Sequence, residues 1–233
     1  MFTIRDCNEI ELNKLDKLDI DKNIIKILKY FDNEIFFYNK RDEYINDNAC
    51  WVNFTGLTSY RPFIIIDYLF NNNIINSNSN ILDIGCGLSE MGIELNRKYN
   101  YVKYTGLDIN NNLINLNNLN IKNQNFKFIN FDFKNINDYN KLNNTYNIIF
   151  ACGATIDIIE IFPYICDNIK PNYIVCESHI NRKNDLINII NVCKNYSVIN
   201  NDGYNFSYKS VNGPDDINWI GYKRILYILK KNI

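Results

Sequence analysis

The chain has 233 residues, which is enough for one domain with a modest extension and for a sizeable buried core. Its 25 Lys and Arg residues balance 26 Asp and Glu residues, and no long basic run occurs, so a nucleic-acid partner is not expected. Seven cysteines without a CxxC pair and a single histidine argue against a zinc site, and we predict no metal. The odd number of cysteines predicts reduced thiols and a cytoplasmic location.

The first expected unit is a mostly helical extension at 1–57, where apolar residues recur at helical spacing. We expect it to act as a lid over a main domain at 58–233. The start of the chain lacks the apolar stretch of a signal peptide, and no later segment has the roughly 20 apolar residues of a membrane span, so we expect no contact with a membrane. A helix is predicted next, because Thr58 or Ser59 can cap it and Pro62 suits its first turn.

From residue 80 onward, short apolar segments typical of buried strands alternate with longer segments typical of helices. Strands are predicted at 80–84, 102–107, 126–131, 146–151 and 172–177. Helices are predicted at 89–98, 111–120, 155–168 and 183–194. This alternation predicts an α/β fold with a parallel sheet. The tail, with "YSVIN", "NFSYKSV" and "YKRILYILKK", predicts a terminal antiparallel hairpin interrupted by a turn at 212–216.

The segment "ILDIGCGLSEMGIEL" joins the first predicted strand to a predicted helix through two glycines. Gly85 and Gly87 allow a tight turn and leave room for a ligand, because they have no Cβ. Asp108 lies at the end of the next strand, at close to the roughly 20-residue spacing of an acid that binds ribose hydroxyls. These features predict a nucleoside ligand. Glu90 stands where the dinucleotide fingerprint has its third glycine and would repel a pyrophosphate, so an NAD-dependent oxidoreductase is disfavoured.

These segments resemble the class I S-adenosylmethionine-dependent methyltransferases over roughly 80–230. The family motif reads D/E-x-G-x-G-x-G, and "DIGCGLS" matches it at Asp83, Gly85 and Gly87, with Ser89 in place of the third glycine. The resemblance implies a Rossmann-like, doubly wound, mostly parallel seven-stranded sheet with a C-terminal antiparallel hairpin. It also implies S-adenosylmethionine as cofactor and S-adenosylhomocysteine as product.

The same resemblance assigns cofactor contacts to the loops after the first three strands. Asp83 would orient the amino group of the methionine part, and the two glycines would pass beneath that part. Asp108 would bind both ribose hydroxyls, and Ile109 would pack on the adenine. Asp132 would lie near the adenine amino group, where Phe131 or Phe133 would stack. The cofactor-binding residues expected are Asp83, Gly85, Gly87, Asp108, Ile109, Asp132, Phe131, Tyr60 and Arg61, the last two reaching the methionine carboxylate.

The methyl acceptor is expected at the ends of the fourth and fifth strands. The fourth strand ends in "CGAT", where methylases of amino groups in bases and glutamine carry N/D-P-P-Y/F, so base N-methylation is disfavoured. At the end of the fifth strand, Glu177 and His179 are two residues apart and would face the same side of a strand. Such a pair can act as an oriented general base, although both residues can equally lie at a polar helix start. Asp157 is a third catalytic candidate, for orienting a hydroxyl.

Three further residues are candidates for substrate binding. Arg182 and Lys183 can hold a phosphate or carboxylate, or can simply begin a solvated helix. Trp51 can stack on the substrate, or can pack the extension onto the sheet. The sequence alone leaves these alternatives open.

The predicted function is methylation of a small molecule, with oxygen as the acceptor atom. By analogy with the family, a sugar or a phosphorylated precursor of surface polysaccharide is the expected substrate. The alternatives are an RNA or protein methyltransferase and a non-catalytic scaffold that keeps the cofactor fold. A lid can equally serve as the arm of a homodimer, so the oligomeric state stays open.

Overall fold

The computed structural model describes residues 61–87, 89–142, 145–153, 158–180, 183–201, 203–211 and 217–232. The predicted extension at 1–57 lies outside these ranges, and so does the turn predicted at 212–216. None of the described helices has the length and apolar character needed to cross a bilayer.

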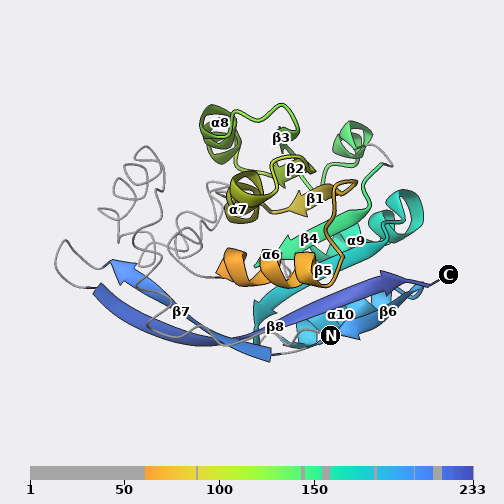
Figure 1. Cartoon of the computed structure of the whole chain (residues 1–233). Coiled ribbons are helices and arrows are strands. Elements are labelled where there is room, and N and C mark those ends of the chain that lie inside the picture. Colours follow the sequence, from red (N-terminus) through yellow and green to blue (C-terminus); the bar gives the residue numbers. More distant parts are fainter. Residues whose placement is uncertain are drawn as a thin grey trace.

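Strands and helices alternate along the main domain as the sequence predicts (Figure 1). The strands are β1 (Asn80–Ile84), β2 (Lys103–Asp108), β3 (Phe126–Asn130), β4 (Ile148–Cys152), β5 (Tyr173–His179), β6 (Tyr196–Asn200), β7 (Gly203–Val211) and β8 (Ile217–Lys231). The longer helices are α6 (Arg61–Asn71), α7 (Glu90–Lys98), α8 (Asn111–Asn120) and α10 (Lys183–Val192). Pro62 lies in the first turn of α6, as predicted, since proline needs no partner for a backbone N–H there.

In the described part of the helix predicted at 155–168, three short pieces take its place. A 3-10 turn (Ile159–Ile161), α9 (Phe162–Tyr164) and a π-helical turn (Ile165–Ile169) follow one another. Pro163 lies at the start of α9, where its missing N–H is harmless, whereas in a helix that began at residue 155 it would interrupt the hydrogen bonding of the interior. A further 3-10 helix (Ile136–Lys141) stands between β3 and β4.

The strands form one sheet in the order β3-β2-β1-β4-β5-β8-β6, with β7 also paired to β8. β1 to β5 run parallel, and β8 is antiparallel to β5, β6 and β7. The chain moves outward from β1 to β3 and then returns to β4 on the other side of β1. This reversal between β1 and β4 is the point where open α/β sheets bind ligands, beyond the carboxyl ends of the strands.

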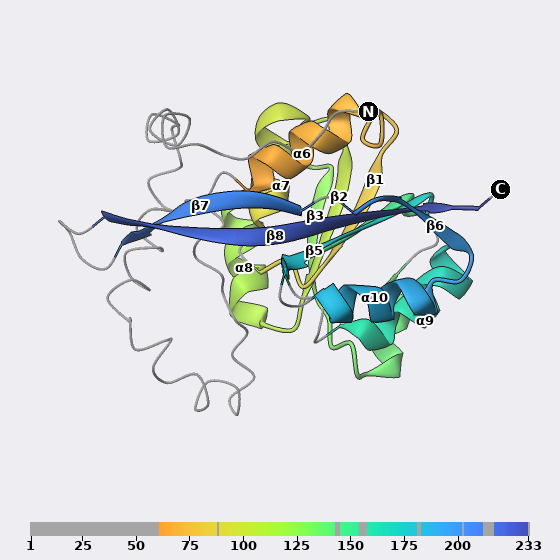
Figure 2. The same ribbon diagram turned by 90° about the horizontal axis from the view of Figure 1, so that it is seen from below.

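The two stretches β6 and β7 lie on the same edge of β8. Asn200 of β6 is in register with Ile228, and Gly203 of β7 is in register with Ile225. They therefore occupy one strand position with an irregular joint, and the sheet has the seven strand positions and terminal hairpin that were expected. Beyond β5, which pairs only as far as Arg224, the β7–β8 ribbon runs on past the carboxyl end of the sheet (Figure 2).

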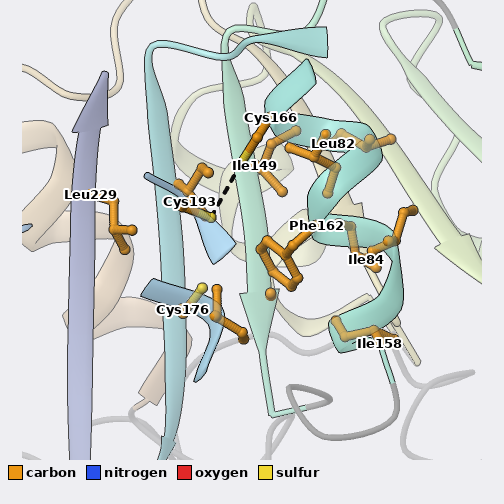
Figure 3. Packing of buried hydrophobic residues seen from close by; sticks show 14 of the residues in the cluster. Leu82, Ile84, Ile149, Ile158, Phe162, Cys166, Cys176, Cys193 and Leu229 are labelled. Atoms are coloured by element: carbon orange, nitrogen blue, oxygen red, sulfur yellow. Dashed lines mark hydrogen bonds between the residues drawn. The ribbon is translucent and has the colours of Figure 1, made fainter. Parts of the chain in front are cut away.

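Each face of the sheet has its own apolar core. One core packs the sheet against α6, α7 and α8, and the other packs it against α9 and α10. The described cysteines, Cys86, Cys152, Cys166, Cys176 and Cys193, are free thiols. In the second core the Sγ atoms of Cys166 and Cys193 lie 3.2 Å apart (Figure 3).

Candidate functional site

Two buried carboxylates stand at the carboxyl ends of β1 and β2. Asp83 lies within β1 and Asp108 ends β2, and each side chain is almost fully buried. Burying a carboxylate is costly unless it is hydrogen-bonded, so both acids need partners. The hydroxyl of Tyr104 donates to Oδ2 of Asp83 at 2.5 Å, and the backbone N–H of Asn110 donates to Oδ1 of Asp108 at 2.9 Å.

The loop after β1 takes a left-handed backbone at every second residue. Gly85 has φ of 68°, Gly87 has φ of 54° and Ser89 has φ of 58°. Glycine adopts this conformation at no steric cost, whereas serine does so at a cost of about 1 kcal/mol. Ser89 therefore keeps the backbone shape that the third glycine of the motif would give.

Side chains from β2 and α8 hold this loop in place. The backbone N–H of Gly87 donates to Oδ2 of Asp108 at 2.9 Å, and the amide of Asn117 donates to the carbonyl oxygen of Gly87 at 2.8 Å. The loop is thus fixed before any ligand arrives.

Open space beside Gly87 makes the loop suitable for a cofactor. A Cβ built on Gly87 would meet no atom of the described chain within 4 Å. A nucleoside with free ribose hydroxyls and an ammonium group fits the residues of this site, because carboxylates accept hydrogen bonds from both groups.

The loops after β2 and β3 place the residues expected near the adenine. Ile109 is half-buried and directly follows β2, and its carbonyl oxygen accepts a hydrogen bond from Asn130 at 2.7 Å. Asp132 is half-buried, and its Oδ1 accepts from the backbone N–H of Lys134 at 2.9 Å. Its own backbone N–H donates to Oδ2 of Asp138 at 2.8 Å, so Asp138 fixes this loop.

Phe131 lies in the core beside the loop after β3. Its side chain has no exposed surface and packs in the second core, with its ring centroid 5.4 Å from that of Tyr139. Its contact with the adenine stays a prediction. Phe133 is half-buried, with its ring centroid 5.2 Å from that of Phe131, and it is the better placed of the two for stacking.

Glu177 is buried and paired with an arginine. Both of its carboxylate oxygens accept hydrogen bonds from Arg224 of β8: Nε donates to Oε1, and Nη2 donates to Oε2 at 2.6 Å. The side chains of Glu177 and Arg224 are 0% and 1% exposed. A carboxylate engaged in this bidentate pair is an internal counter-ion, and its role as a general base stays a prediction.

β5 ends at His179, so residues 177 and 179 both belong to this strand. They are two positions apart, which is the spacing of residues on one face of a strand. The backbone of His179 is in register with Arg224 of β8, at the carboxyl end of the sheet. Lys183 begins α10 and is exposed. Arg61 begins α6. Trp51, Tyr60, Asp157 and Arg182 lie outside the described residues.

Three side chains of this region were missed by sequence reasoning: Tyr104, Asn117 and Arg224. Tyr104 and Arg224 lie on strands, where their spacing is that of ordinary core positions. Asn117 is one of many asparagines in α8 and has no distinguishing signal. Only Arg224 gave a hint, since a charged residue inside the apolar segment "YKRILYILKK" needs a buried partner. Among the described residues, no group of three or more His, Cys, Asp or Glu side chains is placed to hold a metal ion.

Comparison with known proteins agrees with this geometry. Residues 75–229 match a family described as a methyltransferase domain, which is more than half of the chain. No curated protein matches the sequence.

Three solved structures illustrate the likeness of fold. The precorrin-6y C5,15-methyltransferase of Geobacter metallireducens has a TM-score of 0.55 and 15% identity, covering 71% of this chain and 86% of its own. The putative RNA methyltransferase of Pyrococcus horikoshii has a TM-score of 0.55 and 10% identity, covering 74% of this chain and 84% of its own. The magnesium protoporphyrin IX methyltransferase of Synechocystis, solved with bound S-adenosylmethionine, has a TM-score of 0.53 and 16% identity, covering 92% of this chain and all of its own.

The matched family, the strand order and the glycine loop with its two carboxylates all lead to one assignment. The chain belongs to the methyltransferase domain family, with the class I fold and with S-adenosylmethionine as its cofactor.

Proposed function

We propose that the protein methylates an oxygen atom of a small molecule, with a sugar or a phosphorylated precursor of surface polysaccharide as the substrate class. The position of His179 carries this proposal, because the chain's single histidine ends β5 at the edge where the acceptor is expected. An alcohol is a poor nucleophile until a base takes its proton, and neutral imidazole is suited to this at physiological pH.

The neighbouring charges support His179 rather than Glu177 as the base. Arg224 engages both carboxylate oxygens of Glu177. This acid therefore contributes a fixed charge pair beneath the end of β5, and His179 is the candidate that remains on that strand. Asp157 and Arg182, which lie outside the described residues, keep their proposed roles in orienting a hydroxyl and an anionic group.

The cofactor supplies an electrophilic methyl group on a sulfonium. The residues of this chain then have two tasks, which are to hold the cofactor in one orientation and to present the acceptor oxygen in line with that methyl group. Positioning of this kind can supply much of the rate acceleration. Asp83, Gly87 and Asp108 serve the first task, and the ends of β4 and β5 serve the second.

The balanced charge of the chain supports a small acceptor over a long polyanion. The fourth strand ends at Cys152 and is followed by Gly153, without the N/D-P-P-Y/F sequence of base-amino methylases. Likeness to an RNA methyltransferase at 10% identity concerns the fold alone.

The test is release of S-adenosylhomocysteine from S-adenosylmethionine in the presence of candidate acceptors. Sugars, sugar phosphates and total RNA are compared, each with the wild type and with the His179→Ala and His179→Gln variants. Turnover with a sugar, reduced about 100-fold in both variants and restored in part at higher pH, supports the proposal. Turnover only with RNA, falling steeply with salt, would replace it with the RNA alternative.

A further inference from the structure

A buried tyrosine connects the first carboxylate to the glycine loop. Tyr104 of β2 is 1% exposed, and its hydroxyl donates to Oδ2 of Asp83 at 2.5 Å. The same hydroxyl oxygen accepts a hydrogen bond from Oγ of Ser89 at 3.1 Å. The three side chains thus form one hydrogen-bonded series from the helix start, through β2, to the acid of β1.

The direction of this series is fixed by the chemistry of the phenol. Burial, and then the negative charge of Asp83, raise the pKa of Tyr104 well above its usual range. The phenol therefore keeps its proton at all working pH values and remains a donor to the carboxylate. A donor held on one oxygen limits rotation of the carboxylate plane, so the orientation of Asp83 is set in advance.

The neighbouring glycines leave the space that this arrangement needs. A Cβ on Gly92, in the first turn of α7, would overlap Oγ of Ser89 and lie 2.9 Å from the ring of Tyr104. Gly106 is the residue of β2 in register with Asp83, and a Cβ there would lie 2.8 Å from Sγ of Cys86. Gly92 is thus small at the point where Ser89 and Tyr104 meet, whereas Gly106 makes room for Cys86 and Phe128 beside them.

We propose that Tyr104 is a positioning residue that orients Asp83 toward the amino group of S-adenosylmethionine, with Ser89 orienting Tyr104 in turn. The proposal rests on the assignment of Asp83 to that amino group. Ser89 then has a function beyond its backbone shape, because a glycine at the same place would keep the turn and lose the hydroxyl. Ser89, which departs from the family motif, is thereby coupled through Tyr104 to Asp83, which begins that motif.

The test separates the two ends of the cofactor. Calorimetry measures the affinity of S-adenosylhomocysteine, which carries the amino group, and of 5′-methylthioadenosine, which lacks the amino-acid part. We expect Tyr104→Phe to weaken S-adenosylhomocysteine about tenfold and to leave 5′-methylthioadenosine unchanged. Tyr196→Phe is the matched control. Tyr196 of β6 is also buried, and its hydroxyl donates to the carbonyl oxygen of Pro171 at 2.9 Å.

Equal loss of both ligands in Tyr104→Phe, or loss of neither, would overturn the proposal. If the wild type binds neither ligand, the cofactor assignment itself fails, which is a different result from a lack of selectivity. Tyr104→Phe leaves the buried hydroxyl of Ser89 without its acceptor. The double variant Tyr104→Phe with Ser89→Gly removes that hydroxyl as well. We expect it to regain stability and to keep the selective loss.

A double-mutant cycle with Asp83→Ala shows whether Tyr104 acts through Asp83. In the Asp83→Ala background, Tyr104→Phe should have no further effect on S-adenosylhomocysteine. A full tenfold effect in that background would mean that Tyr104 acts independently, and would overturn the proposal.

Discussion

Gly87 donates its backbone N–H to the carboxylate of Asp108 over 2.9 Å, so the acid that ends β2 also closes the glycine loop after β1. Its other carboxylate oxygen, Oδ1, accepts the backbone N–H of Asn110, so this one side chain fixes the loops after both β1 and β2. The predicted ribose contact would add a third role to the same carboxylate.

Replacing Asp108 with alanine should abolish cofactor binding and also destabilise the fold. The variant loses the acceptor for the ribose hydroxyls and leaves two backbone N–H groups without their partner, and hydrogen bonds to a charged group contribute about 1.5–3 kcal/mol each. Calorimetry with S-adenosylhomocysteine should show at least about a 100-fold loss of affinity. Asp167→Ala, at an exposed acid of the π-helical turn, should change neither binding nor stability. Unchanged affinity in Asp108→Ala would remove Asp108 from the site.

Removing one charge of the buried pair of Glu177 and Arg224 should destabilise the protein more than removing both charges. Arg224→Met leaves a buried carboxylate without its counter-charge, which typically costs about 3–5 kcal/mol of unfolding free energy. The double variant Glu177→Leu with Arg224→Met removes both charges and should recover most of that loss. Urea denaturation measures both variants. A single variant that costs less than about 1 kcal/mol would show that the pair is accessible to water.

Gly92→Ala should be destabilising although alanine is the better helix former. The new Cβ would overlap Oγ of Ser89 and press on the ring of Tyr104, and overpacking of this kind costs about 1–3 kcal/mol. Adding Ser89→Gly should restore part of the loss, since it removes one of the two clashes. Thermal unfolding of the three proteins is the measurement, and a stabilised Gly92→Ala would refute the packing described for this helix.

The hydrogen bonds of Asp138 predict that the folded protein loses stability in acid. The hydrogen bond from Lys141, and then that from the backbone N–H of Asp132, lower its pKa below the ordinary value of 3.8. A carboxylate with a lowered pKa in the folded state stabilises the protein above its unfolded pKa, and the effect disappears as the pH falls through the folded pKa. The stability difference between wild type and Asp138→Asn should therefore be constant near neutrality and shrink below about pH 4. A difference that persists at low pH would contradict this role.

Much of the fold could be predicted because its strands are short, apolar and evenly spaced. β1 (Asn80–Ile84), α8 (Asn111–Asn120) and β6 (Tyr196–Asn200) have the predicted bounds. The segment 158–168 was predicted poorly, since an apolar run does not distinguish a regular helix from successive turns. The joint between β6 and β7 also has no local signal, because the partner that places both stretches on one edge is β8, further along the chain.

The cofactor site was more accessible to sequence reasoning than the acceptor site. Gly85, Gly87 and Asp108 lie next to strand ends, so their positions follow from the order of strands and helices. The pairing of Glu177 with Arg224 joins residues 47 apart, and only the antiparallel insertion of β8 beside β5 brings them together. The burial of Phe131 was not predicted for a related reason, because the face on which a strand-end aromatic lies depends on where the strand stops.

The position of β8 has a consequence for the synthesis of the protein. β8 follows every other strand in the chain, yet it fills the place between β5 and the edge formed by β6 and β7. β1 to β5 and their helices can assemble on the ribosome while β5 still has unpaired N–H and C=O groups along one side. Exposed strand edges of this kind recruit other chains. Pairing of β8 with β5 closes this edge, and it thereby removes a site at which the nascent domain can aggregate.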